Sequence, residues 1–275
     1  MIAVTGAGGQ LGQAVLQEAS KRGIEAKGFS RQELDASDAS SVKSAFAGAQ
    51  FDCIVNCAAF TAVDKAESEP AQAFLGNAFA PWLLGRTGVP VLHVSTDYVF
   101  DGKGTRPYLE SDAVRPLSVY GLSKRAGESA LLESGACGAI VRTAWLYSKK
   151  QGTKNFYQTM LRLGQSHDEI SVVADQFGAP TLVDDLASGL LDLYQAGVHK
   201  KPMQLFQFVN SGKCSWADFA EAIMSAAGLR CRVKRIASSE WPSPVTRPSY
   251  SVLSTEKFTR VTGKTPRSWQ DALLS

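Results

Sequence analysis

The fold is decided by the first twelve residues, MIAVTGAGGQLG (1–12). The apolar start predicts a buried strand, and the helical periodicity over 11–22 predicts a helix directly after it. Between them, Gly6, Gly9 and Gly12 form a G-x-x-G-x-x-G spacing. Glycine permits tight backbone angles and a close approach to phosphate groups, and a helix N-terminus offers them free N–H groups. Strand, turn and helix together favour a dinucleotide site over a purely structural turn.

The same alternation continues along the chain. Apolar runs predict further strands at 24–29, 51–56, 89–95 and 139–143, and helical patterns fall at 39–46, 66–84 and 118–133. Strands that alternate with helices predict an α/β fold with a Rossmann-like, doubly wound parallel sheet. The strands are almost continuously apolar, which is typical of a sheet covered on both faces.

The pattern becomes less regular after Trp145, and prolines gather at Pro242, Pro244 and Pro248, where loops are expected. We therefore predict a dinucleotide-binding domain over 1–145, to which a helical segment near 180–197 returns. Residues 146–275 are predicted to form mainly a smaller, discontinuous C-terminal substrate lobe.

Composition and charge exclude several classes of protein. The 275 residues are 44% apolar and 20% charged, as in ordinary soluble globular proteins. The net charge of +3 is too small to indicate a nucleic acid or membrane partner. The local pairs Lys149-Lys150 and Lys200-Lys201 are interpreted as solvated loop residues rather than as a binding patch.

Cysteine usage and hydropathy indicate a cytoplasmic protein. The five cysteines are Cys53, Cys57, Cys137, Cys214 and Cys231. Their odd number and the absence of a Cys-x-x-Cys pair predict free thiols rather than disulfides or a zinc site. Neither a signal segment nor an apolar stretch of about 20 residues is evident. For the oligomeric state we expect a monomer or a weak homodimer.

The end of the second strand favours one nicotinamide cofactor. An acidic residue there would bind the ribose 2′-hydroxyl of NAD, whereas an arginine accommodates the 2′-phosphate of NADP. The sequence over 29–32 is FSRQ, and Glu33 comes too late. Arg31 is thus the candidate for the 2′-phosphate, against the alternative of a solvated surface arginine. NADPH is expected, with NADH possible.

Tyr120 and Lys124 are four residues apart on the predicted helix and therefore share one of its faces. A nearby ammonium group should lower the pKa of the tyrosine. Tyr120 could then give a proton to a carbonyl oxygen while hydride reaches the carbon, and Lys124 could also bind the nicotinamide ribose. By itself this spacing occurs in many proteins, but here it follows a glycine turn and a fourth strand.

Ser95-Thr96-Asp97-Tyr98 ends that fourth strand. Ligands of open parallel sheets bind at this edge, so a hydroxyl there can orient a substrate oxygen toward Tyr120. A polar turn that merely closes the strand is the alternative.

The glycine turn, Ser-Thr-Asp and Tyr-x-x-x-Lys, in this order, resemble the extended short-chain dehydrogenase/reductases. Within that group the sequence is most similar to the dTDP-4-dehydrorhamnose reductases. The matching stretches span nearly the whole chain: 5–12, 56–67, 94–102, 119–124, 142–145, 178–181 and 247–248.

The resemblance implies that NADPH reduces the 4-keto group of dTDP-4-dehydro-6-deoxy-L-mannose to give dTDP-L-rhamnose for surface polysaccharide. It implies a catalytic set of Thr96, Tyr120 and Lys124. It implies that the cofactor is lined by Gly9, Gln10, Leu11, Asp35, Ala36, Ala58, Ala59, Phe60 and Thr61. It also implies that the sugar nucleotide is contacted by Val63, Thr96, Asp97, Tyr98 and Trp145, although Trp145 would also suit a core position.

One departure from the family and two differences from related enzymes bear on this interpretation. Some members of the family form magnesium-bridged dimers through a glutamate just after the glycine turn, whereas Gln13-Ala14 stand here. Magnesium requires oxygen ligands, usually carboxylates, so we expect no metal. Dehydratases of this fold have Thr-Asp-Glu where this chain has Tyr98, and epimerases have an acidic residue where this chain has Ser30-Arg31.

One alternative belongs to another functional class. A regulatory subunit of methionine adenosyltransferase is similar across Asp97–Gly102, and it would bind NADP and a partner enzyme without catalysis. The catalytic set does not exclude this alternative. Another NDP-4-keto-sugar reductase also remains open.

Overall fold

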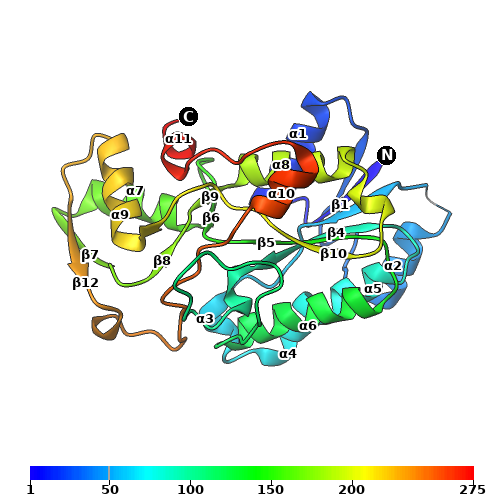
Figure 1. Cartoon of the computed structure of the whole chain (residues 1–275), viewed down its shortest axis with the longest axis horizontal. Coiled ribbons are helices and arrows are strands. Elements are labelled where there is room, and N and C mark those ends of the chain that lie inside the picture. The colour runs from blue at the N-terminus through cyan, green and yellow to red at the C-terminus, as the bar shows by residue number, and fades with distance from the viewer. Residues whose placement is uncertain (49) are drawn as a thin grey trace.

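The computed structural model describes residues 1–48 and 50–275, in which a six-stranded parallel sheet forms the centre (Figure 1). Its strands are β1 (Ile2–Thr5), β2 (Ala26–Phe29), β3 (Cys53–Asn56), β4 (Val91–Thr96), β5 (Gly138–Thr143) and β10 (Gln204–Gln207). The spatial order is β10-β5-β4-β3-β1-β2. The chain thus reverses direction across the sheet between β1 and β3, and open α/β sheets bind their ligands outside such a point.

Helices cover both faces of the sheet (Figure 1). One layer contains α1 (Gln10–Lys21), α8 (Val183–Gln195) and α10 (Glu256–Thr262). The other contains α2 (Ala39–Phe46), α5 (Ala80–Gly85) and α6 (Val119–Glu133). The prediction of a Rossmann-like, doubly wound sheet is confirmed.

The strand residues alternate between the two layers. Ile2 and Val4 pack in the core beneath α1 and α8, whereas Ala3 packs in the opposite core beneath α2, α5 and α6. Both faces of β1 are fully buried. This burial explains why the strands are continuously apolar rather than alternating.

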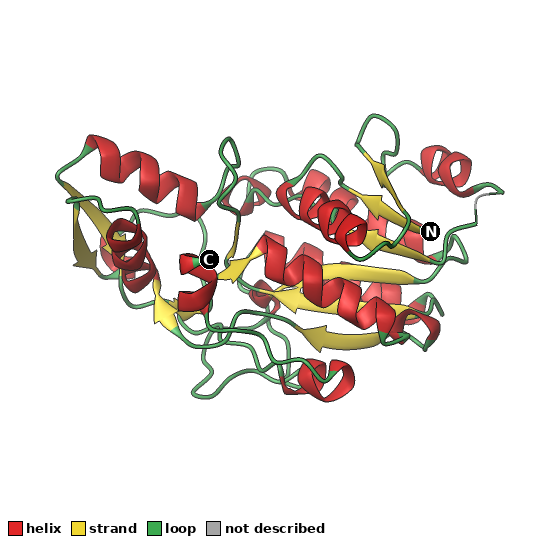
Figure 2. Ribbon diagram, turned by 90° about the horizontal axis from the view of Figure 1, so that it is seen from above, coloured by secondary structure: helices red, strands yellow, loops and turns green. Residues whose placement is uncertain are grey.

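A smaller lobe lies beside the sheet (Figures 1 and 2). It contains α7 (Phe156–Ser166), β7 (Glu169–Val173), α9 (Trp216–Ala226), β12 (Arg232–Ile236) and α11 (Trp269–Leu274). Two short pairs, β6 (Leu146–Tyr147) with β9 (Thr181–Leu182) and β8 (Phe177–Gly178) with β11 (Cys214–Ser215), complete it. Phe219 and Ile223 are fully buried in its own apolar core.

Two segments return from the C-terminal half to the sheet. Helix α8 packs on α1, within the returning segment predicted at 180–197. Strand β10 extends the sheet beyond β5, with Phe206 opposite Val141, and the sequence analysis did not anticipate it. The division of the chain at residue 145 stays a prediction.

The long helix expected over 66–84 is interrupted. It is divided into α3 (Val63–Ala66), α4 (Pro70–Phe74), the π-helical segment η1 (Leu75–Phe79) and α5. The wide π turn brings the Asn77 carbonyl against α6, where a Cβ atom on Gly127 would lie 2.0 Å from its oxygen. The interruption therefore allows these helices to approach closely.

Gly12 lies where the glycine turn meets α1. A Cβ atom there would lie 2.3 Å from the Gly6 oxygen and 2.8 Å from the Ala7 Cα atom, both of them backbone. Because backbone cannot rotate away, Gly12→Ala should lower the free energy of unfolding by about 1–3 kcal/mol or more. Urea denaturation measures this change.

Gly8→Ala is the matched control, because a Cβ atom on Gly8 meets nothing within 4 Å. Its free energy of unfolding should stay within about 0.5 kcal/mol of the parent protein. Equal stabilities of the two variants would contradict the packing argument for Gly12.

Candidate active site

A cavity of about 980 Å³ opens at the carboxyl ends of the strands. Its lining comes from the glycine turn, the segments after β2, β3, β4 and β5, and the loop before α7. Of the sequence-predicted site residues, those lining it are Gly6, Gly9, Gln10, Leu11, Arg31, Asp35, Ala36, Ala58, Ala59, Phe60, Thr61, Val63, Thr96, Asp97, Tyr98, Tyr120, Lys124 and Trp145. Gly12 is the exception, because it lies beneath the turn and packs against Gly6.

The glycine turn fits a pyrophosphate group. Gly6 has a φ of 65°, and a Cβ atom there would lie 2.8 Å from the Ala58 nitrogen, so only glycine suits this approach. Gly9 begins α1 without any side-chain cap, and the first turn contains no acidic residue. The N–H groups and the positive end of the helix dipole are therefore available to an anion.

Arg31 lies at the outer part of this cavity. Its side chain is 83% exposed, and its Nε atom is 3.7 Å from the Asp35 carboxylate. Asp35 itself accepts hydrogen bonds from the backbone N–H and hydroxyl of Ser37, which lower its pKa. Asp35 is thus held by the backbone, whereas Arg31 makes only a loose, solvated ion pair and can turn toward a ligand.

The predicted catalytic residues converge at one end of the cavity. Tyr120 and Lys124 lie in the first two turns of α6, which begins where the Ser118 hydroxyl accepts the Gly121 N–H. Thr96 ends β4. The rings of Tyr120 and Tyr98 meet edge to face, with centroids 5.5 Å apart.

The expected effect of Lys124 on Tyr120 is wrong for this structure. Burial raises the pKa of Tyr120, a hydrogen bond with Thr96 opposes the rise, and the nearby Asp97 adds to it. The ammonium group of Lys124 donates to the Val94 carbonyl at 2.6 Å and is not among the groups that shift the pKa of Tyr120. Tyr120 is consequently a protonated phenol at neutral pH, which is the form that can donate a proton.

Lys124 is buried, with 2% exposure. Burial lowers its pKa from 10.5 to about 8, against a smaller opposing effect of Glu128. Its Nζ atom also lies 3.4 Å from the His93 Nε2 atom. The hydrogen-bonding state of His93 therefore bears directly on Lys124.

A series of buried hydrogen bonds determines which nitrogen of His93 carries the proton. Asn56 accepts through Oδ1 from the Thr5 hydroxyl at 2.7 Å and from the Ala58 N–H at 3.1 Å, so its Nδ2 group faces His93 Nδ1 at 2.9 Å. The amide nitrogen can only donate, which makes Nδ1 the acceptor and leaves the His93 proton on Nε2. Burial keeps the pKa of His93 well below its usual value, so the ring is neutral. The Nε2–H group then points at Lys124 and favours its neutral amine.

An ion pair fixes α6 against the sheet. The guanidinium of Arg142 on β5 donates twice to the Glu128 carboxylate, each time at 2.8 Å, and the Ser95 hydroxyl donates to the same carboxylate at 2.7 Å. Arg142 and Glu128 are both buried. Because Glu128 lies one turn beyond Lys124, this pair sets the position of the catalytic face of the helix.

Asn77, on the π-helical segment, is a positioning residue that the sequence did not reveal. It accepts from the Phe60 N–H at 2.8 Å and donates to the Phe60 carbonyl at 2.9 Å and to the Ser123 hydroxyl at 3.0 Å. It thus connects the loop after β3, which is predicted to line the cofactor, to α6. An asparagine within a helical pattern carries no distinguishing signal.

Two further cavity residues were missed by the sequence analysis. Trp216 stacks on Trp145 with ring planes 6° apart and centroids 3.5 Å apart. Arg247 donates to the Tyr98 hydroxyl at 2.8 Å and pairs with Asp64 at 2.6 Å. Trp145 has a φ of 47°, unusual for a bulky residue, so its ring is held over the cavity by the surrounding structure.

Asp97 is buried beside Thr96, with 2% exposure. Its Oδ2 atom has no hydrogen-bond partner among the residues that the structure describes. Burial raises its pKa to about 6, against hydrogen bonds from Ser251 and Thr96. An unpartnered buried carboxyl oxygen is suited to binding a hydroxyl group of a ligand.

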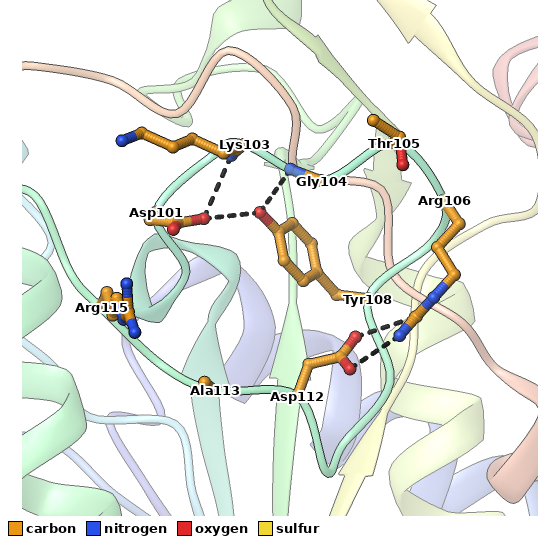
Figure 3. A pocket seen from close by; sticks show the side chains of 9 residues that line it. All are labelled: Asp101, Lys103, Gly104, Thr105, Arg106, Tyr108, Asp112, Ala113 and Arg115. Carbon is orange, nitrogen blue, oxygen red and sulfur yellow. Dashed lines mark hydrogen bonds and ion pairs between the residues drawn. The ribbon is translucent and has the colours of Figure 1, made fainter.

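A second, shallower cavity of about 320 Å³ lies under the loop after β4 (Figure 3). Several of its polar groups are already paired: the Tyr108 hydroxyl accepts the Gly104 N–H and donates to Asp101, and Arg106 pairs with Asp112. The larger cavity is therefore the candidate active site.

The structure also places the cysteines and the side chains that could hold a metal ion. All five cysteines are free thiols. Across residues 1–48 and 50–275, His, Cys, Asp and Glu side chains nowhere gather in groups of three that could hold a metal ion. None of the helices described over the same residues has the length and apolar character needed to cross a bilayer.

Together, the doubly wound sheet, the glycine turn and the Thr96, Tyr120 and Lys124 cluster define an oxidoreductase of the short-chain dehydrogenase/reductase class. The family model described as "RmlD substrate binding domain" matches residues 1–275. The chain belongs to this family.

Curated relatives match over almost the full length. The spore coat polysaccharide biosynthesis protein SpsK of Bacillus subtilis is 39% identical over 99% of this chain and 95% of its own. A dTDP-4-dehydrorhamnose reductase of Sinorhizobium fredii is 39% identical over 98% of this chain and 94% of its own.

Solved structures agree with the fold. A dTDP-4-dehydrorhamnose reductase from Clostridium acetobutylicum superposes with a TM-score of 0.92 at 37% identity, covering 99% of this chain and 96% of its own. The Bacillus anthracis enzyme, solved in complex with NADP, has a TM-score of 0.91 at 35% identity with the same coverage.

The buried Lys124 should make stability depend on pH. A lysine whose folded pKa is about 8 and whose ordinary value is 10.5 binds more protons when unfolded, so stability rises with pH between these values. Each pH unit in that window contributes up to about 1.4 kcal/mol. Lys124→Met should therefore flatten the rise in the free energy of unfolding between pH 8 and 10.5, as measured by urea denaturation.

Lys21→Met is a suitable control, since the Lys21 side chain is 72% exposed. This variant should keep the pH dependence of the parent protein. A Lys124→Met curve that runs parallel to the parent curve across the window would show that Lys124 titrates normally.

Proposed function

We propose that the protein is an NADPH-dependent reductase that converts the 4-keto group of dTDP-4-dehydro-6-deoxy-L-mannose into the hydroxyl group of dTDP-L-rhamnose. The observation that carries the proposal is the convergence of Thr96, Tyr120 and Lys124 beside an uncapped glycine turn in one cavity. The family membership and the names of the relatives support the choice of substrate. No metal is part of this proposal.

Bound NADPH would supply the hydride. The chain's own residues would supply the proton and the orientation. The Tyr120 hydroxyl, kept protonated by burial, donates its proton to the substrate oxygen. The Thr96 hydroxyl, which donates to the Asp97 carboxylate at 3.0 Å in the structure, would turn its proton to the same oxygen. Lys124 would bind the nicotinamide ribose. Because the lysine is anchored to the Val94 carbonyl, its position is fixed before the ligand arrives.

The part of the cavity around Tyr98, next to the catalytic cluster, suits the sugar nucleotide. Trp145 and Trp216 offer a flat apolar surface, and Arg247 offers a cation beside Tyr98 for a phosphate group. Asp97 would accept a sugar hydroxyl through its unpartnered oxygen. Val63 lines the same region.

The alternatives are less well supported by these residues. Tyr98 cannot act as the base that a dehydratase requires, since burial raises its pKa. A non-catalytic subunit that only binds NADP would have no need for a protonated Tyr120 and a buried lysine beside it. Turnover of the keto sugar distinguishes this subunit from a reductase.

Tyr120→Phe removes the proton donor while leaving the ring in place. The parent protein should oxidise NADPH when given the dTDP-keto sugar, and the variant should lose about 100-fold or more in kcat with an unchanged Kd for NADPH. Absorbance of NADPH at steady state measures turnover, and nucleotide fluorescence measures binding.

Tyr108→Phe provides the control, because its hydroxyl lies in the second cavity (Figure 3). It should keep the parent kcat. Full turnover by Tyr120→Phe would exclude Tyr120 as the acid. NADPH binding by the parent without any turnover would favour the non-catalytic alternative.

Arg31→Ala tests the choice of nicotinamide cofactor. Loss of a charge-assisted hydrogen bond to the 2′-phosphate should raise the Kd of NADPH about tenfold and leave that of NADH unchanged. Arg232→Ala, at a similarly exposed arginine on β12, should change neither. An unaltered ratio of the two dissociation constants in Arg31→Ala would assign the 2′-phosphate to another residue.

A further inference from the structure

The loop between β6 and α7, residues 148–155, crosses from the smaller lobe to the glycine turn. Asn155 donates to the Gln10 side chain at 3.2 Å, and Lys150 donates from Nζ to the Gln13 side chain at 2.7 Å. Gln13 in turn folds back and donates to the Gly8 carbonyl at 3.2 Å. Both ends of the loop are thereby tied to the first turn of α1, where the cavity is open to phosphate groups.

The charge of Lys150 is not neutralised in this arrangement. Its partner Gln13 is a neutral amide, and no ion pair forms at Lys150 within the described part of the chain. The first twelve residues contain no charged side chain, and α1 has no acidic residue in its first turn. The Lys150 ammonium group is therefore an unneutralised cation hydrogen-bonded to the first turn of α1, where the glycine turn itself offers an anion only N–H groups.

The neighbouring Lys149 does not share the orientation of Lys150. Lys149 turns to the opposite side and donates to the carbonyls of Leu273 and Ser275, each at 2.6 Å. Lys150, by contrast, lines the cavity together with Lys154 and Gly152. Lys149 is partly buried by these two contacts, whereas Lys150 is exposed at the cavity.

We propose that Lys150 is a cofactor-binding residue whose ammonium group exchanges the Gln13 amide for the pyrophosphate of the nicotinamide dinucleotide, while Asn155 keeps the 148–155 loop attached to α1. This inference rests on the proposed function, because it requires a dinucleotide at the turn. The exchange is favourable because a lysine–phosphate hydrogen bond joins two charges, whereas the lysine–amide bond joins only one. Arg31 would then bind the 2′-phosphate of NADPH, and Lys150 would bind its pyrophosphate.

This division can be tested by fluorescence titration of the purified protein with NADPH and with NADH. Both nucleotides contain the pyrophosphate, and only NADPH has the 2′-phosphate. Lys150→Gln should raise the Kd of both nucleotides by a similar factor, about tenfold, whereas Arg31→Ala should affect NADPH alone. The Lys150→Gln dissociation constants should also depend less on salt concentration, since one charge contact is lost.

Two variants make the test specific. Lys149→Gln removes a lysine of the same loop that points away, and it should bind both nucleotides like the parent protein. Lys150→Arg keeps the charge and should restore most of the affinity, which separates lost charge from a disturbed loop.

Three results would overturn the assignment. Lys150→Gln that binds both nucleotides as tightly as Lys149→Gln would show that the lysine makes no contact. A loss confined to NADPH would mean that Lys150 binds the 2′-phosphate instead. A parent protein that binds neither nucleotide would contradict the proposed function itself, and this outcome is visible before any variant is measured.

Discussion

The contact on which the rest of the molecule depends is the approach of the glycine turn to the chain after β3. At Gly6 there is no room for a Cβ atom, because it would lie 2.8 Å from the Ala58 nitrogen. This approach joins β1 to β3 at the point where the strand order reverses, and it lets Asn56 bridge Thr5 and His93. The same contact that closes the sheet thus begins the polar chain leading to Lys124.

The opposite wall of the site is fixed by buried charge rather than by backbone approach. Glu128 and Arg142 lie in the interior, where their desolvation is offset by paired hydrogen bonds and by the Ser95 hydroxyl. Removing either partner would leave a buried charge, so the pair holds α6 in one position. Tyr120 and Lys124 consequently keep their orientation without any contact from a ligand.

The sequence alone predicts those parts of the fold and site that depend on residues close together in the chain. The glycine turn, the apolar strands and the Tyr-x-x-x-Lys spacing each lie within a short segment, and their geometry follows from backbone rules. Arg247 and Trp216 could not be found in this way, because Arg247 meets Tyr98 across 149 residues of chain. The raised pKa of Tyr120 was also out of reach, since it depends on burial and on the direction of the Lys124 side chain.

These pKa values give the cavity an uneven distribution of charge. Its interior groups tend toward neutrality: Tyr120 keeps its proton, His93 is uncharged, and burial lowers the pKa of Lys124 and raises that of Asp97. Cationic side chains line the same cavity, among them Arg31, Lys150 and, beside Tyr98, Arg247. Under the proposed function, these cations would attract the anionic ligands, while the carbonyl oxygen would meet hydrogen bonds from Tyr120 and Thr96. The attraction would then come from groups other than the proton donor, which could stay uncharged at neutral pH.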